Sequence, residues 1–235
     1  MTLLTTIQNA ADRIGIVRPT SVVGSADQQV RQLLSLAQQE GKELARRHPW
    51  QALIMEKSIT ATATETQTGA IPTDFDRFVD ETFYNRTAKR KVAGPMNPQE
   101  WADYKGRTAA FVWDAFRVRG NSILLAPTPA AGDNYVYEYV STYWATTTGS
   151  TTPSLAAWAA DTDEGILSEE LMTLGIVWRF KQAKGLDYAE AFRTYEAQLA
   201  MMMGRDGGKR RSYMGQSTNL RYRPRVAVPE GSWNL

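Results

Sequence analysis

Cysteine is absent from this 235-residue chain, and histidine occurs once, as His48. The absence of cysteine excludes disulfides, thiol nucleophiles and zinc sites with thiolate ligands. One histidine leaves a zinc site without enough ligands, and no nucleophile-elbow motif is present for a Ser–His triad. Because His48 precedes Pro49 at the end of a predicted helix, we expect it to be a packed or capping residue, and we expect no metal site.

Long apolar runs are also absent. No stretch of about 18 consecutive apolar residues occurs, so we expect no transmembrane helix and no membrane partner. The first residues, 1–4, carry no basic side chain, and the polar Asn9 and Asp12 follow closely. We therefore also expect no signal peptide at this end.

Complete enzyme motifs are missing too. Residues 204–210 depart from a phosphate-binding loop, because Met203 occupies the first glycine position and Arg210 the Ser/Thr position. Glycosidases need two carboxyls facing each other across a cleft, which neighbouring acids in a sequence do not show. The acidic pairs considered are Asp74 and Asp76, Asp80 and Glu81, and Asp161 and Asp163. We assign these pairs to turns, caps and solvated faces, and predict no cofactor and no enzymatic activity.

The charges that are present are unevenly distributed. The chain is 43% hydrophobic and 22% charged, which is ordinary for a globular protein that buries a core. Residues 204–235 contain seven Lys/Arg but two Asp/Glu, whereas the rest of the chain contains 20 Lys/Arg and 23 Asp/Glu. A slightly acidic body therefore carries a basic C-terminal tail.

Four segments have apolar residues at helical spacing. They begin near Thr2, Ser25, Glu164 and Asp187, and the second segment ends before Pro49. Ser25 to Gln28 fits a capping box at the start of that second helix. Since each helix has one apolar face that needs a partner, we predict that residues 1–49 and 160–204 form a four-helix bundle.

Residues 50–148 have a different pattern. Short runs of β-branched and aromatic residues alternate with Gly, Pro and Asn, as in Ile59–Thr64 and Tyr135–Val140, and one helical turn is expected near Trp101. Residues 149–159, rich in Thr, Ser and Ala, are predicted to be a linker. The predicted fold class is therefore α+β, a four-helix bundle with an inserted antiparallel β module and an extended C-terminal tail. We expect four aromatic residues to belong to the core of the β module, namely Trp101, Tyr104, Trp113 and Trp144.

The tail, residues 205–235, is the feature that points most directly to a function. Three interpretations compete: a disordered solubilising tail, a nucleic-acid arm, and a segment that orders on a protein partner. Arginine interleaved with aromatic residues suits the last two, because both side chains stack and arginine forms bidentate pairs. The apolar residues Val226, Val228, Trp233 and Leu235 favour a protein partner. The predicted docking residues are Arg205, Lys209, Arg210, Arg211, Tyr213, Arg221, Tyr222, Arg223, Arg225 and Trp233.

Several segments form an ordered series along the chain: Ile71–Phe78, Gly94–Pro95 with Glu100–Trp101, Leu124–Pro129, Tyr137–Trp144, Asp161–Glu164, Trp178–Tyr188 and Tyr195–Glu196. Together they cover about residues 70–208. In this order they resemble the head-to-tail adaptor proteins of tailed bacteriophages, especially short-tailed ones.

This resemblance implies a non-enzymatic virion protein in the neck between head and tail, assembled in the host cytoplasm. Such adaptors form a ring, usually a dodecamer, under the portal protein, and a C-terminal extension grips the portal. The ring continues the DNA channel without reading sequence and offers a platform to a downstream tail or nozzle protein. Two alternatives stay open from the residues alone, a DNA-binding module with a basic arm and a virion-associated cell-wall hydrolase.

Overall fold

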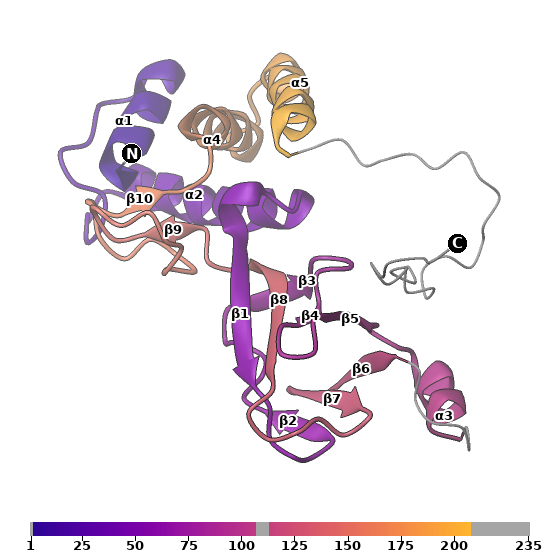
Figure 1. Cartoon of the computed structure of the whole chain (residues 1–235). Coiled ribbons are helices and arrows are strands. Elements are labelled where there is room, and N and C mark those ends of the chain that lie inside the picture. Colours follow the sequence, from indigo (N-terminus) through magenta and orange to yellow (C-terminus); the bar gives the residue numbers. More distant parts are fainter. Residues whose placement is uncertain (1, 107–112, 208–235) are drawn as a thin grey trace, which may run out of the picture. The chain divides into compact units, whose positions relative to one another are not determined.

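The computed structural model describes residues 2–106 and 113–207, which contain five α-helices and ten strands (Figure 1). The helices are α1 (Leu3–Ile14), α2 (Gln28–Arg47), α3 (Pro98–Gly106), α4 (Glu169–Ala183) and α5 (Ala189–Arg205). The strands are β1 (Ile54–Thr60), β2 (Thr66–Thr68), β3 (Phe75–Phe78), β4 (Tyr84–Asn85), β5 (Arg90–Ala93), β6 (Asp114–Arg119), β7 (Ser122–Ala126), β8 (Asn134–Ser141), β9 (Ala145–Thr146) and β10 (Glu164–Gly165). None of the helices in these two ranges combines the length and the apolar character that crossing a membrane would require.

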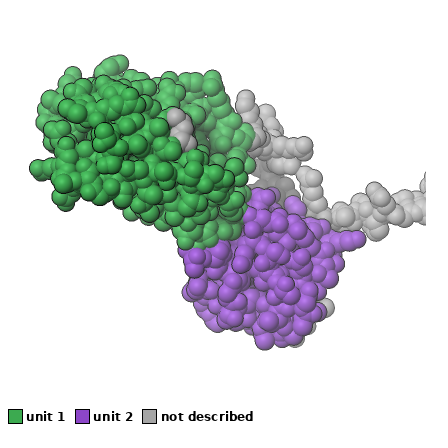
Figure 2. Space-filling view, turned by 90° about the vertical axis from the view of Figure 1, so that its left-hand side faces the viewer, with its two compact units in different colours: residues 1–55, 74–77, 139–209 green, residues 56–73, 78–138, 210–235 purple. Residues whose placement is uncertain are grey.

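The described residues divide into two compact units, which are coloured separately in Figure 2. Unit 1 contains residues 2–55, 74–77 and 139–207. Unit 2 contains residues 56–73, 78–106 and 113–138. Helices α1, α2, α4 and α5 therefore belong to unit 1, whereas α3 and most of the strands belong to unit 2.

Helix α4 is the central helix of unit 1 and packs against α1, α2 and α5 (Figure 1). Its buried residues run consecutively from Gly175 to Phe180, so they lie on every side of the helix rather than on one stripe. A helix that is apolar all round is stable in water only when other elements cover it. The three neighbouring helices provide that cover.

All four predicted helices of unit 1 are present, but two predicted starts are wrong. The third predicted helix was expected to begin near Glu164, whereas Glu164 lies in β10 and α4 begins at Glu169. The predicted start of α2 is also wrong. Its N-cap is Asp27, whose carboxylate accepts a hydrogen bond from the Gln29 N–H at 2.8 Å. Ser25 instead accepts one from the Asp27 N–H at 3.3 Å, outside the helix. Asp27 suits the cap because a carboxylate both accepts from a free N–H group and complements the positive end of the helix dipole.

The predicted fold class, a four-helix bundle with an inserted antiparallel β module, is wrong. The chain is organised around one large mixed sheet with strand order β1-β8-β4-β5-β6-β7-β2, in which β3 also pairs with β8. Strands β5 and β6 are parallel, with Val92 opposite Asp114 and Ala93 opposite Ala115. Parallel neighbours need a long connection, and the segment that contains α3 provides it.

Aromatic side chains fill the core of unit 2. The Phe83 ring stacks on Phe116, with ring centroids 4.3 Å apart, and on Tyr137, with centroids 5.4 Å apart. Trp101 and Tyr104 of α3 pack in a second cluster with Leu124. Consecutive residues are buried along β6, β7 and β8, and because side chains alternate between the two faces of a strand, both faces of these strands are covered.

Three of the four predicted core aromatics are buried, namely Trp101, Tyr104 and Trp144, and Trp113 is partly buried. Trp144 belongs to unit 1, where its ring makes an edge contact with Trp158, the centroids lying 4.9 Å apart. Trp158 is itself buried, although it lies in the segment predicted to be a linker. Strands β9 and β10 pair beside this contact, so the segment is held in a defined conformation.

Candidate functional site at the root of the C-terminal tail

The predicted docking residues begin where α5 ends. Arg205 is the last residue of α5 and is exposed, so its guanidinium is free to meet a partner and complements the negative end of the helix dipole. The other nine predicted docking residues lie outside the described residues: Lys209, Arg210, Arg211, Tyr213, Arg221, Tyr222, Arg223, Arg225 and Trp233. Within the described residues, this site consists of the end of α5 and Asp206, which are called the root of the tail below.

Asp206, the residue after α5, fixes that root to the end of α2. Its Oδ2 atom accepts a hydrogen bond from the backbone N–H of Gln51 at 2.9 Å and lies 3.2 Å from Nε2 of His48. The His48 ring in turn makes an edge contact with Trp50, with centroids 4.9 Å apart. His48 is thus a packed residue at the C-cap of α2, as predicted. The chain direction at Asp206 is set by these contacts before the tail begins.

A second tie holds the middle of α5 to α2. Arg47 donates a hydrogen bond from Nη1 to Oε1 of Glu196 at 2.6 Å, and its guanidinium lies 5.6 Å from the centre of the Tyr195 ring. Both charged side chains are partly exposed, at 32% and 40%. Pairs of this exposure add little stability, so their effect is to fix position rather than to drive folding.

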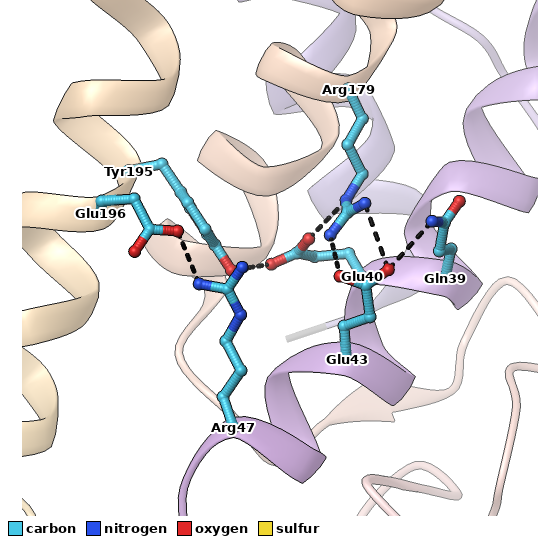
Figure 3. A network of polar contacts seen from close by, with 7 residues as sticks. All are labelled: Gln39, Glu40, Glu43, Arg47, Arg179, Tyr195 and Glu196. Carbon is cyan, nitrogen blue, oxygen red and sulfur yellow. Dashed lines mark hydrogen bonds and ion pairs between the residues drawn. The ribbon is translucent and has the colours of Figure 1, made fainter.

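A buried ionic network lies beneath this tie (Figure 3). The Glu40 side chain on α2 is fully buried and accepts hydrogen bonds from Tyr195 Oη at 2.6 Å and from Arg179 Nε at 2.7 Å. Arg179 on α4 also donates from Nη2 to Oε2 of Glu43 at 2.7 Å. Glu43 accepts a further bond from the Gln39 amide at 3.0 Å. Side chains from α2, α4 and α5 meet at the single carboxylate of Glu40.

The environment sets the charge of each member of the network. Burial raises the pKa of Glu40, and the hydrogen bonds from Tyr195 and Arg179 offset only part of that effect. Burial alone would also raise the pKa of Glu43. The hydrogen bonds from Gln39 and Arg179 outweigh that effect, so the pKa of Glu43 is lowered. Burial raises the pKa of the Tyr195 hydroxyl, so this group stays protonated and acts as a hydrogen-bond donor. The network therefore acts as a structural connection between α2, α4 and α5.

The sequence analysis did not find this network. One signal was available, because Arg179 interrupts the otherwise apolar run of α4 and a buried arginine needs a carboxylate partner. The partners are 139 and 136 residues away, at Glu40 and Glu43, and no sequence spacing identifies them. Nothing in the sequence indicated the contacts of Asp206 with Gln51 and His48, because an acidic residue after a helix is common.

Asp161 and Asp163, one of the three acidic pairs considered as catalytic candidates, bind backbone groups. Asp161 accepts hydrogen bonds from the N–H groups of Val22, at 3.0 Å, and Val23, at 2.7 Å. Asp163 accepts from the N–H groups of Ala159 and Ala160, at 2.7 and 2.8 Å. Both carboxylates therefore shape loops of unit 1.

Asp74 and Asp76, a second of these pairs, bind side chains. Asp74 accepts hydrogen bonds from the Tyr139 hydroxyl at 3.1 Å and from Ser141 Oγ at 2.7 Å, and Asp76 pairs with Arg77 at 2.5 Å. In the two described ranges, no group of three or more Asp, Glu and His side chains is arranged to hold a metal ion.

The described residues combine a large mixed sheet with a helical unit in which a buried ionic network joins α2, α4 and α5. The model of the SU10 adaptor protein family matches residues 1–224, and the chain therefore belongs to that family. A comparison with curated proteins gave no significant match.

Membership of this family confirms the predicted resemblance to the adaptor proteins of tailed phages. The family consists of structural adaptor proteins, so the chain is a phage structural protein, and the family gives no support to the hydrolase alternative.

Proposed function

We propose that the chain assembles as a ring, most simply a dodecamer, beneath the phage portal protein and joins the head to the tail. Residues 205–235 bind the portal in this proposal, and the ring continues the DNA channel towards a downstream tail or nozzle protein. The protein is assembled in the host cytoplasm and ends in the neck of the virion. Neighbouring copies meet through two different faces, as closed rings of identical subunits require.

The fixed root of the tail is the observation that carries this proposal. A basic segment on a loose attachment searches a large volume, and its ordering on a partner costs binding free energy. Here Asp206 and α5 are held by α2 and α4, so the position where the tail starts is set before binding. Pre-positioning of this kind lowers the entropic cost of docking on a portal.

Negative-stain imaging of mixtures with purified portal protein tests the proposal. The chain, a variant lacking residues 208–235, and the double variant Arg210→Gln/Arg223→Gln are each mixed with portal. We expect a ring density under the portal for the intact chain, no ring for the deletion variant, and weakened assembly for the double variant. Lys42→Gln/Arg46→Gln on α2 is the matched control, because it removes two exposed cations from the folded part of the chain.

The outcomes separate the parts of the proposal. Ring assembly that survives deletion of residues 208–235 would show that the tail does not dock on the portal. Equal weakening by the α2 control would show that only total charge matters. Ring order follows from the rotational symmetry of the averaged images, and any symmetry other than twelvefold contradicts the dodecamer.

A further inference from the structure

Strands β4 and β5 form a short hairpin in unit 2 with two unlike faces. Tyr84 lies opposite Lys91, and Asn85 lies opposite Arg90. Asn85 is fully buried, whereas Tyr84 is 37% exposed and Lys91 is exposed. Because side chains alternate along a strand, Tyr84 and Lys91 share the outer face of the hairpin.

The turn of this hairpin is held by side-chain contacts. The Asn85 carbonyl Oδ1 accepts a hydrogen bond from the Ala88 N–H at 2.9 Å. The Thr87 hydroxyl accepts one from the Asn134 N–H at 2.9 Å, and the Arg86 N–H donates to the Asn134 carbonyl at 2.8 Å. Lys89 has a φ of 54°, in the left-handed region, which these bonds maintain. The exposed side chains of the turn therefore project from a defined backbone.

Four of the six residues from Arg86 to Lys91 are cations, and they differ in their pairing. Arg90 binds Asp114 at 2.7 Å, and this carboxylate is only 4% exposed, so Arg90 has a structural partner. Arg86 pairs with Glu56 at 2.8 Å, but both side chains are about half exposed, and such a pair exchanges readily for another anion. No residue of the described ranges forms an ion pair with Lys89 or Lys91.

We propose that the outer face of this hairpin, consisting of Tyr84, Arg86, Lys89 and Lys91, binds the sugar–phosphate backbone of duplex DNA. Lysine, arginine and tyrosine hydroxyl groups are among the side chains that contact DNA phosphates, and such contacts carry no sequence information. Two unpaired lysines supply charge that displaces condensed counterions. The rigid turn presents these groups together.

The hairpin fits nucleic acid better than an acidic protein surface. Tyr84 is the only large hydrophobic residue exposed in the described part of unit 2. Protein interfaces usually have an apolar, desolvated centre with the charges at the rim. A phosphate backbone needs no such centre. The inference goes beyond the proposed function, since it does not depend on ring assembly or on the portal.

Fluorescence anisotropy with a labelled 30-base-pair duplex of mixed sequence tests the inference on the full chain. Binding is measured at several salt concentrations for the wild type and for Lys89→Gln/Lys91→Gln. Loss of two phosphate contacts is expected to lower affinity about tenfold at low salt and to reduce the slope of log K against log salt by about 2. Lys42→Gln/Arg46→Gln, which removes two exposed cations from unit 1, is the matched control and should leave the slope unchanged.

Three results would overturn the inference. The first is an unchanged affinity and slope in the hairpin variant, which would place any DNA binding elsewhere, the basic tail included. The second is an equal loss in the α2 control. The third is equally tight binding of poly-glutamate that is weakened to the same extent by Lys89→Gln/Lys91→Gln, which would assign the face to acidic proteins. Both lysines are exposed, so unchanged circular dichroism is expected, and portal assembly is scored separately for each variant.

Discussion

Arg179 is the residue on which the buried network of unit 1 depends. Replacing Arg179 by Met leaves the Glu40 carboxylate buried with Tyr195 as its remaining partner. Removal of one partner of a buried ion pair typically costs about 3–5 kcal/mol, and we expect a loss of that size at pH 7. Urea denaturation followed by circular dichroism measures it.

Glu43→Gln is the control for this change. The Glu43 side chain is 41% exposed, and its loss leaves Arg179 paired with Glu40, so a cost of about 1 kcal/mol or less is expected. Equal costs for the two variants would mean that burial of Glu40 does not decide the energetics of the network.

The pH dependence of Arg179→Met has a definite sign. Burial raises the pKa of Glu40 above 4.5 in the folded chain, and removing the cation raises it further. The folded state then binds a proton more tightly than the unfolded state, so the free energy of unfolding falls as pH rises through the window above 4.5. The deficit of Arg179→Met relative to wild type should therefore shrink between pH 7 and pH 5.

The double variant Arg179→Met/Glu40→Gln isolates this effect. Without the Glu40 carboxyl the network has no buried carboxyl left to take up the proton, and the partly exposed Glu43 is its remaining acid around Arg179. The deficit relative to wild type should therefore lose most of the dependence that Arg179→Met shows. Denaturation curves at pH 5, 6 and 7 make the comparison. The same pH dependence in both variants would contradict the assignment to Glu40.

Gly175 on α4 leaves the space that the Glu40 carboxyl group occupies. A Cβ atom at position 175 would overlap that carboxyl group, whereas a Cβ atom at Gly204 on α5 would meet nothing within 4 Å. We expect Gly175→Ala to destabilise the chain by about 3 kcal/mol through overpacking. Gly204→Ala should stabilise it by about 0.5–1 kcal/mol, because alanine favours helix. Thermal denaturation of both variants distinguishes a helix-propensity effect from a packing effect.

At the scale of elements, α5 is held to the rest of unit 1 at separate points. Asp206→Ala removes the contacts of Asp206 with Gln51 and His48 but leaves the Tyr195–Glu40 hydrogen bond in place. We therefore expect faster amide exchange in the last two turns of α5, with little change in global stability. Hydrogen–deuterium exchange of peptides covering residues 196–205 measures this.

A matched variant shows whether the effect is specific. Asp187→Ala removes a carboxylate from the other end of α5, where Asp187 accepts a hydrogen bond from the Ala189 N–H at 3.1 Å. It should speed exchange near residue 189 and leave residues 196–205 unchanged. Fast exchange at the C-terminal end in wild type and Asp206→Ala alike would mean that Asp206 does not hold the root of the tail.

The elements were not equally predictable from the sequence. Apolar residues at helical spacing predicted α1, α2, α4 and α5, although the buried residues of α4 lie on every side of that helix. Strands as short as β4 and β9, two residues each, have no measurable period. Their pairing is decided by contacts far apart in sequence, such as Tyr84 with Val136, and the parallel pair β5–β6 is likewise invisible to local patterns.

At the scale of the whole molecule, average charge conceals local charge. Residues 1–203 contain 20 Lys/Arg and 23 Asp/Glu, and this slightly acidic balance gives by itself no sign of a DNA-binding surface. In the β4–β5 hairpin Arg90 pairs with the buried Asp114, whereas no residue within 2–106 and 113–207 forms an ion pair with Lys89 or Lys91. The tail was identifiable because residues 204–235 hold seven Lys/Arg and two Asp/Glu, whereas the division of the hairpin cations by their partners required the fold.

Removing residues 208–235 tests whether the tail and the folded units are independent. The core residues and the contacts described above lie within residues 2–106 and 113–207. They include the ionic network around Glu40 and the hydrogen bond of Asp206 with Gln51. We therefore expect the deletion variant to keep the circular dichroism spectrum and the urea midpoint of the full chain, while it fails to assemble on the portal. A lowered midpoint would show that the tail contributes to the core, and loss of assembly would then reflect misfolding instead of a missing docking segment. An unchanged midpoint together with lost assembly assigns the defect to docking, because the root of the tail is still in place and only the segment beyond it is gone.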